Sequence, residues 1–145
     1  MNIKELKQKK KELWKKRLPI LKDEKMYHFD WVELNNIEKE LSSLGADLKE
    51  KYLPIIEKNK DKLKSIIQSK EDDIFKIYGG GKRDHSLIFM CESRKENKWI
   101  HIDIDFFSNS VLIKKKDNMI NTYYWRYKDI NINIIREIFH RAAAI

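Results

Sequence analysis

Residues 98–116 read KWIHIDIDFFSNSVLIKKK, and this stretch decides the fold class. Apolar and polar residues alternate on both sides of residues 108–109, which is the pattern of two half-buried strands joined by a turn. A two-residue turn at that point places Asp103 opposite Lys114, so that acid meets base across the strands. We therefore predict an antiparallel hairpin with one apolar face and one charged face.

The same alternation recurs on both sides of this hairpin. It is found in residues 74–78 and 85–93 before the hairpin and in residues 121–128 after it. The connections between these segments are too short for the crossovers that a parallel sheet needs. The sequence therefore predicts an antiparallel meander.

The residues before the sheet have helical periodicity instead. Apolar side chains recur every three or four positions in residues 2–18, in residues 31–44 and from residue 47 to residue 70. Proline and glycine are common at helix ends, so we expect the first helix to end at Pro19 and the second at Gly45.

A final helix follows the strands, because Asp129 or Asn131 can cap an apolar helical pattern that runs to the end of the sequence. The predicted fold is α+β, with N-terminal helices, an antiparallel β-meander of about five strands and a C-terminal helix. We expect a single domain over residues 1–145, with a helical part at 1–70 and the sheet and last helix at 71–145.

Positive charge is concentrated at the N-terminus. Residues 1–22 hold nine basic and two acidic side chains, a net charge of +7. The whole chain carries a net charge of +8, so nearly all of the excess lies in this segment. This distribution is typical of a segment that contacts an anionic partner. The chain also has 25 lysines against 6 arginines, which coding bias in an AT-rich genome would produce, so a merely solvated face stays open. The candidate contact residues of the helix are Lys7, Lys10, Lys11, Lys15 and Arg17.

Burial of the apolar side of this helix would distinguish the two interpretations. If Leu6, Leu13 and Trp14 are exposed, the helix is amphipathic for a partner. If they are buried, the lysines form the solvated side of a core helix.

The strand at residues 98–106 carries the weak candidates for a metal site. Alternation puts His101, Asp103 and Asp105 on one face, where they could bind a divalent cation. The predicted pairing with lysines explains the same acids as a salt-bridged outer face, and a polar binding surface is the third possibility. No motif in the sequence completes a nuclease site.

Residues 78–85 read YGGGKRDH and contain a glycine run followed by lysine. A P-loop requires Ser or Thr after the lysine and a helix beyond, whereas here Arg83 and a strand follow. We predict a hairpin turn that exposes Lys82 and Arg83 at its tip.

The strand at residues 121–128 is rich in aromatic residues. Alternation places Trp125 on the core side and leaves Tyr124 and Arg126 on the other. Tyr and Arg dominate protein interface hot spots and also stack on the bases of single-stranded nucleic acids. We therefore add these two residues to the candidate contact surface.

Few function classes remain after the motifs are considered. We expect no membrane segment, because the apolar runs are far shorter than the roughly 18 residues of a span. A single cysteine and the absence of an apolar leader suggest a cytoplasmic protein. We expect no cofactor and no catalytic set.

The leading hypothesis is a non-catalytic protein that binds an acidic protein partner, as an inhibitor, immunity protein or adaptor that occupies the partner's surface. A nucleic-acid-binding protein that uses the basic helix is one alternative, and it predicts binding that weakens steeply with salt. A metal-dependent enzyme that uses His101, Asp103 and Asp105 is another.

Overall fold

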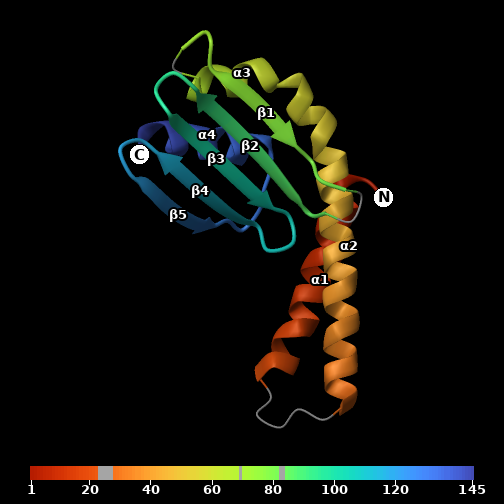
Figure 1. Ribbon diagram of the computed structural model, residues 1–145. Helices are drawn as coiled ribbons and strands as arrows, with labels where there is room; N and C mark the ends of the chain where they lie inside the picture. The colour runs from red at the N-terminus through yellow and green to blue at the C-terminus, as the bar shows by residue number, and fades with distance from the viewer. Residues whose placement is uncertain (23–27, 69, 82–83) are drawn as a thin grey trace.

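The computed structural model describes residues 1–22, 28–68, 70–81 and 84–145 (Figure 1). Its helices in this part of the chain are α1 (Ile3–Lys22), α2 (His28–Lys58), α3 (Lys60–Ile67) and α4 (Ile132–Ala144). Its strands are β1 (Ile74–Tyr78), β2 (Ser86–Ser93), β3 (Lys98–Asp105), β4 (Ser110–Lys116) and β5 (Ile120–Arg126). The order of helices, strands and one last helix confirms the predicted α+β fold.

The strands form one antiparallel sheet in the order β1-β2-β3-β4-β5, which is the predicted meander. One face of this sheet is covered by α4 and by the C-terminal part of the helical region, while the face toward the viewer in Figure 1 carries no helix of the described residues. Phe89 of β2 packs edge-on against Phe139 of α4, with ring centroids 4.9 Å apart. Asn131 caps α4, because its side chain accepts a hydrogen bond from the Ile134 amide.

The predicted register of the β3–β4 hairpin is wrong by two residues. Asp103 pairs with Leu112 and not with Lys114. The reason is a turn of four residues, in which the Asp105 carboxylate accepts a hydrogen bond from the Phe107 amide at 2.8 Å. Asn109 closes this turn in the left-handed conformation, at φ 52°. The two-residue shift keeps the apolar faces together but removes the predicted pairing of acids with lysines.

Helix α1 runs beside α2, and together they extend beyond the sheet (Figure 1). Leu6 and Leu13 of α1 are buried, at 2% and 8% exposure, and belong to the main core. Trp14 packs edge-on against Phe107, with centroids 5.8 Å apart. Most lysines of α1 therefore form the outward side of a helix that packs on the body, whereas Lys7 is half-buried and Lys10 is buried.

The predicted helix ends at Pro19 and Gly45 are wrong, because both residues lie inside longer helices, as does Pro54. The two prolines are exposed, so water can reach the carbonyl groups that lose their amide partners. Gly45 is buried for a different reason. A Cβ atom at this position would lie 3.0 Å from the Cβ of His85 and 3.1 Å from the Phe107 amide nitrogen. Gly45 therefore lets α2 pass close to the sheet.

Lys49 of α2 is completely buried, at 0% exposure. Its ammonium donates hydrogen bonds to the carbonyl oxygens of Gly79 and Gly81, the latter at 2.7 Å, and lies 3.3 Å from a carboxylate oxygen of Glu50. This lysine therefore ties the segment after β1 to the middle of α2.

Candidate functional site

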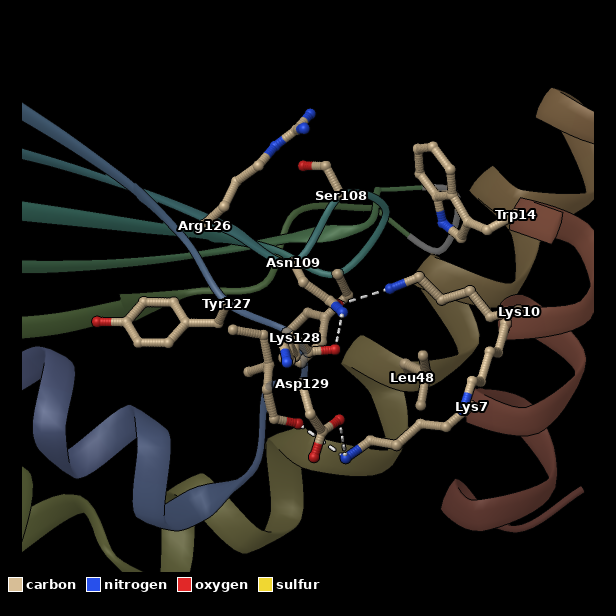
Figure 2. A pocket seen from close by; sticks show the side chains of 13 residues that line it. Lys7, Lys10, Trp14, Leu48, Ser108, Asn109, Arg126, Tyr127, Lys128 and Asp129 are labelled. Atoms are coloured by element: carbon tan, nitrogen blue, oxygen red, sulfur yellow. Dashed lines mark hydrogen bonds and ion pairs between the residues drawn. The ribbon is translucent and has the colours of Figure 1, made fainter. Parts of the chain in front are cut away.

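A pocket with basic walls lies between α1, the β3–β4 turn and the segment that joins β5 to α4 (Figure 2). Its volume is about 650 Å³. The charged residues that line it are Lys7, Lys10, Lys11, Arg126, Lys128 and Asp129. We call this feature the basic pocket. It brings part of the N-terminal basic segment next to the end of the aromatic strand, which lies more than a hundred residues away in the sequence.

Lys10 is the most unusual residue of the basic pocket. It is 5% exposed, and its ammonium donates a hydrogen bond of 2.7 Å to the side-chain oxygen of Asn109. Burial lowers the pKa of Lys10 to about 8, against the opposing effect of Asp105 and Asp129. The partner of this buried cation is a neutral amide, so the positive charge of Lys10 is not neutralised by it.

Lys7 has a more complete set of partners. Its ammonium lies 2.8 Å from a carboxylate oxygen of Asp129 and donates to the Ile130 carbonyl at 2.9 Å. It also lies over the ring of Tyr52, 5.1 Å from the centroid. Burial alone would lower the pKa of Lys7, but Asp129 and Tyr52 outweigh burial and raise it. Lys7 is therefore a charged structural link between α1 and the segment before α4.

Three further cations lie at the rim of the basic pocket. Lys11, Arg126 and Lys128 are exposed, and their side chains make no ion pair or hydrogen bond within the described part of the chain. The Arg126 side chain extends on the side of Ser108, across from Trp14 (Figure 2). These cations leave the pocket with a surplus of positive charge, because Asp129 is already paired with Lys7.

The second candidate surface is the sheet face without a helix, which we call the open face. Strand alternation and the observed register give its residues as Ile74, Lys76, Tyr78, Ser86, Ile88, Met90, Glu92, Trp99, His101, Asp103, Asp105, Ser110, Leu112, Lys114, Lys116, Ile120, Thr122, Tyr124 and Arg126. Arg126 belongs to both features. The open face and the basic pocket are therefore neighbouring parts of one surface.

An apolar row crosses the open face from one edge strand to the other. Tyr78, Ile88, Leu112 and Tyr124 lie in register, with Asp103 between them on the central strand. Tyr78 is 45% exposed, Ile88 37% and Tyr124 57%. Five strands spaced by just under 5 Å make the row about 19 Å long. Large apolar side chains are thus aligned on a surface that no helix of the described chain covers.

The basic and acidic residues of the open face differ in exposure. Lys76, Lys114 and Arg126 are exposed, whereas Glu92, Asp103, Asp105 and Lys116 are partly buried. Asp105 lies at the end of this face in β3 and is bonded to His85, with 2.7 Å between the ring nitrogen and the carboxylate. The fully exposed charged residues of this face are therefore all positive, and its carboxylates are partly buried.

The proposed metal ligands do not form a metal site. Among the described residues, no group of three or more His, Cys, Asp and Glu side chains could hold a metal ion. The His101 ring lies against Trp99, with centroids 4.4 Å apart, and burial lowers the pKa of His101. Burial raises the pKa of Asp103, and Asp105 adds to this effect. One oxygen of Asp103 is buried and has no hydrogen-bond partner within the described residues.

The structure brings four of the nine predicted contact residues together at the basic pocket, namely Lys7, Lys10, Lys11 and Arg126. Tyr124 lies on the open face beside them, as the alternation predicted. Lys15 is exposed on α1, whereas Arg17 is bonded to Glu38 and lies over Trp14. Lys82 and Arg83 lie outside the described residues.

Sequence reasoning missed Asn109 and Lys128 of the basic pocket and Tyr78 and Ile88 of the open face. The last two could have been found, because strand alternation puts them on the same side as Tyr124 once the strands are paired. The first two carried no local signal. Their role depends on where α1 packs against the sheet.

No helix among the described residues has the length and apolar character required to cross a membrane. Comparison with protein-family models, with curated proteins and with solved structures gave no match to this chain.

Proposed function

We propose that this protein binds an acidic protein partner on the open face of its sheet and acts by occupying the partner's surface, as an inhibitor, immunity protein or adaptor does. The observation that carries the proposal is the row of exposed apolar residues, Tyr78, Ile88 and Tyr124, on a sheet face without a helix. Exposed apolar patches on a folded domain commonly mark interaction sites.

The composition of the open face supports a protein partner. Interfaces between proteins are apolar at the centre and polar at the rim, and Tyr and Arg are enriched among their hot spots. The row has Tyr78 and Tyr124 at its ends and Ile88 and Leu112 between them. Arg126 follows Tyr124 by two positions and supplies a cation on the same face.

The charges of this face support an acidic partner. Lys76, Lys114 and Arg126 are its exposed charged residues, so they would steer a negatively charged surface toward the apolar row. The carboxyl group of Asp103 lies in the middle of the same row. That position suits a protein contact better than a strand of phosphates laid across the sheet.

Capture with matched baits tests the proposal. The wild-type protein, Tyr124→Ser and Lys62→Gln would be used to capture proteins from cells of the source organism, and the captured protein would then be purified and titrated. We expect the Tyr124→Ser variant to weaken binding about 30-fold, as the loss of a hot spot does. Lys62 is exposed on α3 and serves as the control, so its variant keeps the wild-type affinity.

Salt provides the second readout. Affinity for the purified partner should fall between about 0.05 M and about 0.3 M salt, because exposed cations steer the encounter. Equal binding by the wild type and Tyr124→Ser would contradict the use of the open face. Binding that ignores salt would contradict the choice of an acidic partner.

A further inference from the structure

We propose that the basic pocket binds a compact polyphosphate group on a small diffusible ligand. This site is separate from the apolar row of the open face. The proposal does not depend on partner binding. Three features of the pocket support it, namely a buried cation, a surplus of positive charge and a limited size.

The first feature is Lys10, a residue of the pocket wall that is 5% exposed. An ammonium has three donors, and one of them is used by the Asn109 side chain. Within the described residues no carboxylate pairs with Lys10, and Asp129 is already bound by Lys7. An anion in the pocket would accept a hydrogen bond from the Lys10 ammonium and would also neutralise its charge.

The second feature is the number of cations around this position. Lys7, Lys10, Lys11, Arg126 and Lys128 line one pocket, against Asp129 as the acidic residue. A single carboxylate would neutralise only a part of this charge, whereas a diphosphate or triphosphate carries several charges on a compact group. Lysines bind phosphate as point charges, and arginine adds a planar fork.

The third feature is the shape of the pocket. Its volume of about 650 Å³ falls within the range of small-ligand sites. Lys7 and Lys10 reach into it from α1, while Arg126 and Ser108 stand on the sheet side (Figure 2). The apolar side chains of Leu48 and Trp14 add surface for the rest of a ligand. A space bounded by three elements suits a small molecule better than a polymer.

The low pKa of Lys10 couples this binding to protons. Lys7 lies on the same helix, Asp105 and Asp129 face Lys10 from the sheet side, and Asn109 is its direct partner. The pKa is about 8, so at pH 8 about half of the molecules lack the proton on Lys10. A polyphosphate would favour the ammonium form, and binding near pH 8 would therefore take up about half a proton per chain at Lys10.

Calorimetric titration with inorganic triphosphate at low salt and pH about 7 tests the site. We expect saturable binding of one triphosphate per chain. Titration with adenosine triphosphate under the same conditions distinguishes the source of the phosphate. Equal affinity would assign an inorganic polyphosphate, and tighter binding would assign a nucleotide that also contacts the apolar wall.

Three variants connect this binding to the pocket. Lys10→Met keeps the length of the side chain and should weaken triphosphate binding about tenfold or more. Lys128→Gln changes an exposed rim residue, so it leaves the fold intact and should also weaken binding. Lys62→Gln removes an equal charge from α3 and should leave the affinity unchanged. Titration near pH 8 in two buffers of different ionisation enthalpy should reveal greater net proton uptake in the wild type than in Lys10→Met, and the difference reports the proton taken up by Lys10.

Absence of saturable triphosphate binding would overturn the proposal. An equal loss of affinity in all three variants would also overturn it, because binding would then follow overall charge. Binding of a single-stranded oligonucleotide in the absence of triphosphate binding would replace the small ligand with a nucleic acid. Each of these results leaves the test of the apolar row unaffected.

Discussion

Lys10 donates its ammonium hydrogen bond to the side-chain oxygen of Asn109, across a distance of 2.7 Å, and so joins α1 to the β3–β4 turn. The two residues are separated by 99 positions in the sequence. Asn109 also donates to the Lys128 carbonyl at 3.1 Å. One asparagine therefore holds together the three segments that form the basic pocket.

The stability of the protein should depend on Lys10 at alkaline pH. Lys10 has a pKa of about 8 in the folded protein against an ordinary 10.5, so the unfolded chain holds its proton to higher pH. Between these values the folded state gains stability as pH rises. From pH about 7 to pH about 9.5, the free energy of unfolding of the wild type should rise by about 2 kcal/mol relative to Lys10→Met. Urea denaturation of both proteins measures this, and parallel curves would refute the shifted pKa.

Gly45→Ala should destabilise the protein, although alanine favours a helix by about 1 kcal/mol. The new methyl group would lie 3.1 Å from the Phe107 amide nitrogen, and backbone atoms there cannot move without disturbing the turn. We expect a net loss of about 1–3 kcal/mol in the free energy of unfolding. Ser43→Ala, at an exposed position of the same helix, is the control and should change stability by less than about 0.5 kcal/mol. A stabilised Gly45→Ala variant would show that α2 does not approach the sheet so closely.

Lys49→Met should lower the free energy of unfolding by about 1–3 kcal/mol, because the Gly79 carbonyl then loses its hydrogen-bond donor. The neighbouring residue Lys51 is exposed, so Lys51→Met provides a matched control with little effect. Thermal and urea denaturation of the two variants would be compared. Equal stabilities would mean that the buried ammonium does not hold this segment.

Tyr124 and Trp125 are adjacent in β5 but lie on opposite faces of the sheet. Trp125 is partly buried, stacked on Tyr123 with centroids 5.9 Å apart and covered by Arg141. We expect Trp125→Ser to cost about 2–4 kcal/mol in stability, whereas Tyr124→Ser should stay within about 0.5 kcal/mol of the wild type. Urea denaturation measures both. A large loss in Tyr124→Ser would contradict its position on an uncovered face.

The fold was predicted from sequence where local pattern decides it. The alternation in β3 and β4 placed the strands correctly, because successive side chains of a strand point to opposite faces. It could not give the hairpin register. The four-residue turn depends on the Asp105 carboxylate and on the left-handed conformation of Asn109, which alternation does not encode.

The candidate site was predicted only in part. The charge of α1 was evident from composition, but the burial of Lys10 depends on how α1 packs against the β3–β4 turn. A second tertiary contact, the close approach of α2 to the sheet, explains why Gly45 lies inside a helix that it was expected to end. Local rules therefore predicted which parts of the chain are helical and which are strands, and the outward position of Tyr124, while contacts between distant segments determined the helix lengths and the pocket.

Site-specific photo-crosslinking tests the central claim most directly. A benzophenone amino acid would replace Tyr124 on the open face, and in a second protein it would replace Lys62 on α3. Both proteins would be irradiated in cells of the source organism. The proposed interface predicts one major adduct with an acidic protein from position 124 and no such adduct from position 62. No adduct from position 124, or the same adducts from both positions, would contradict partner binding on the open face.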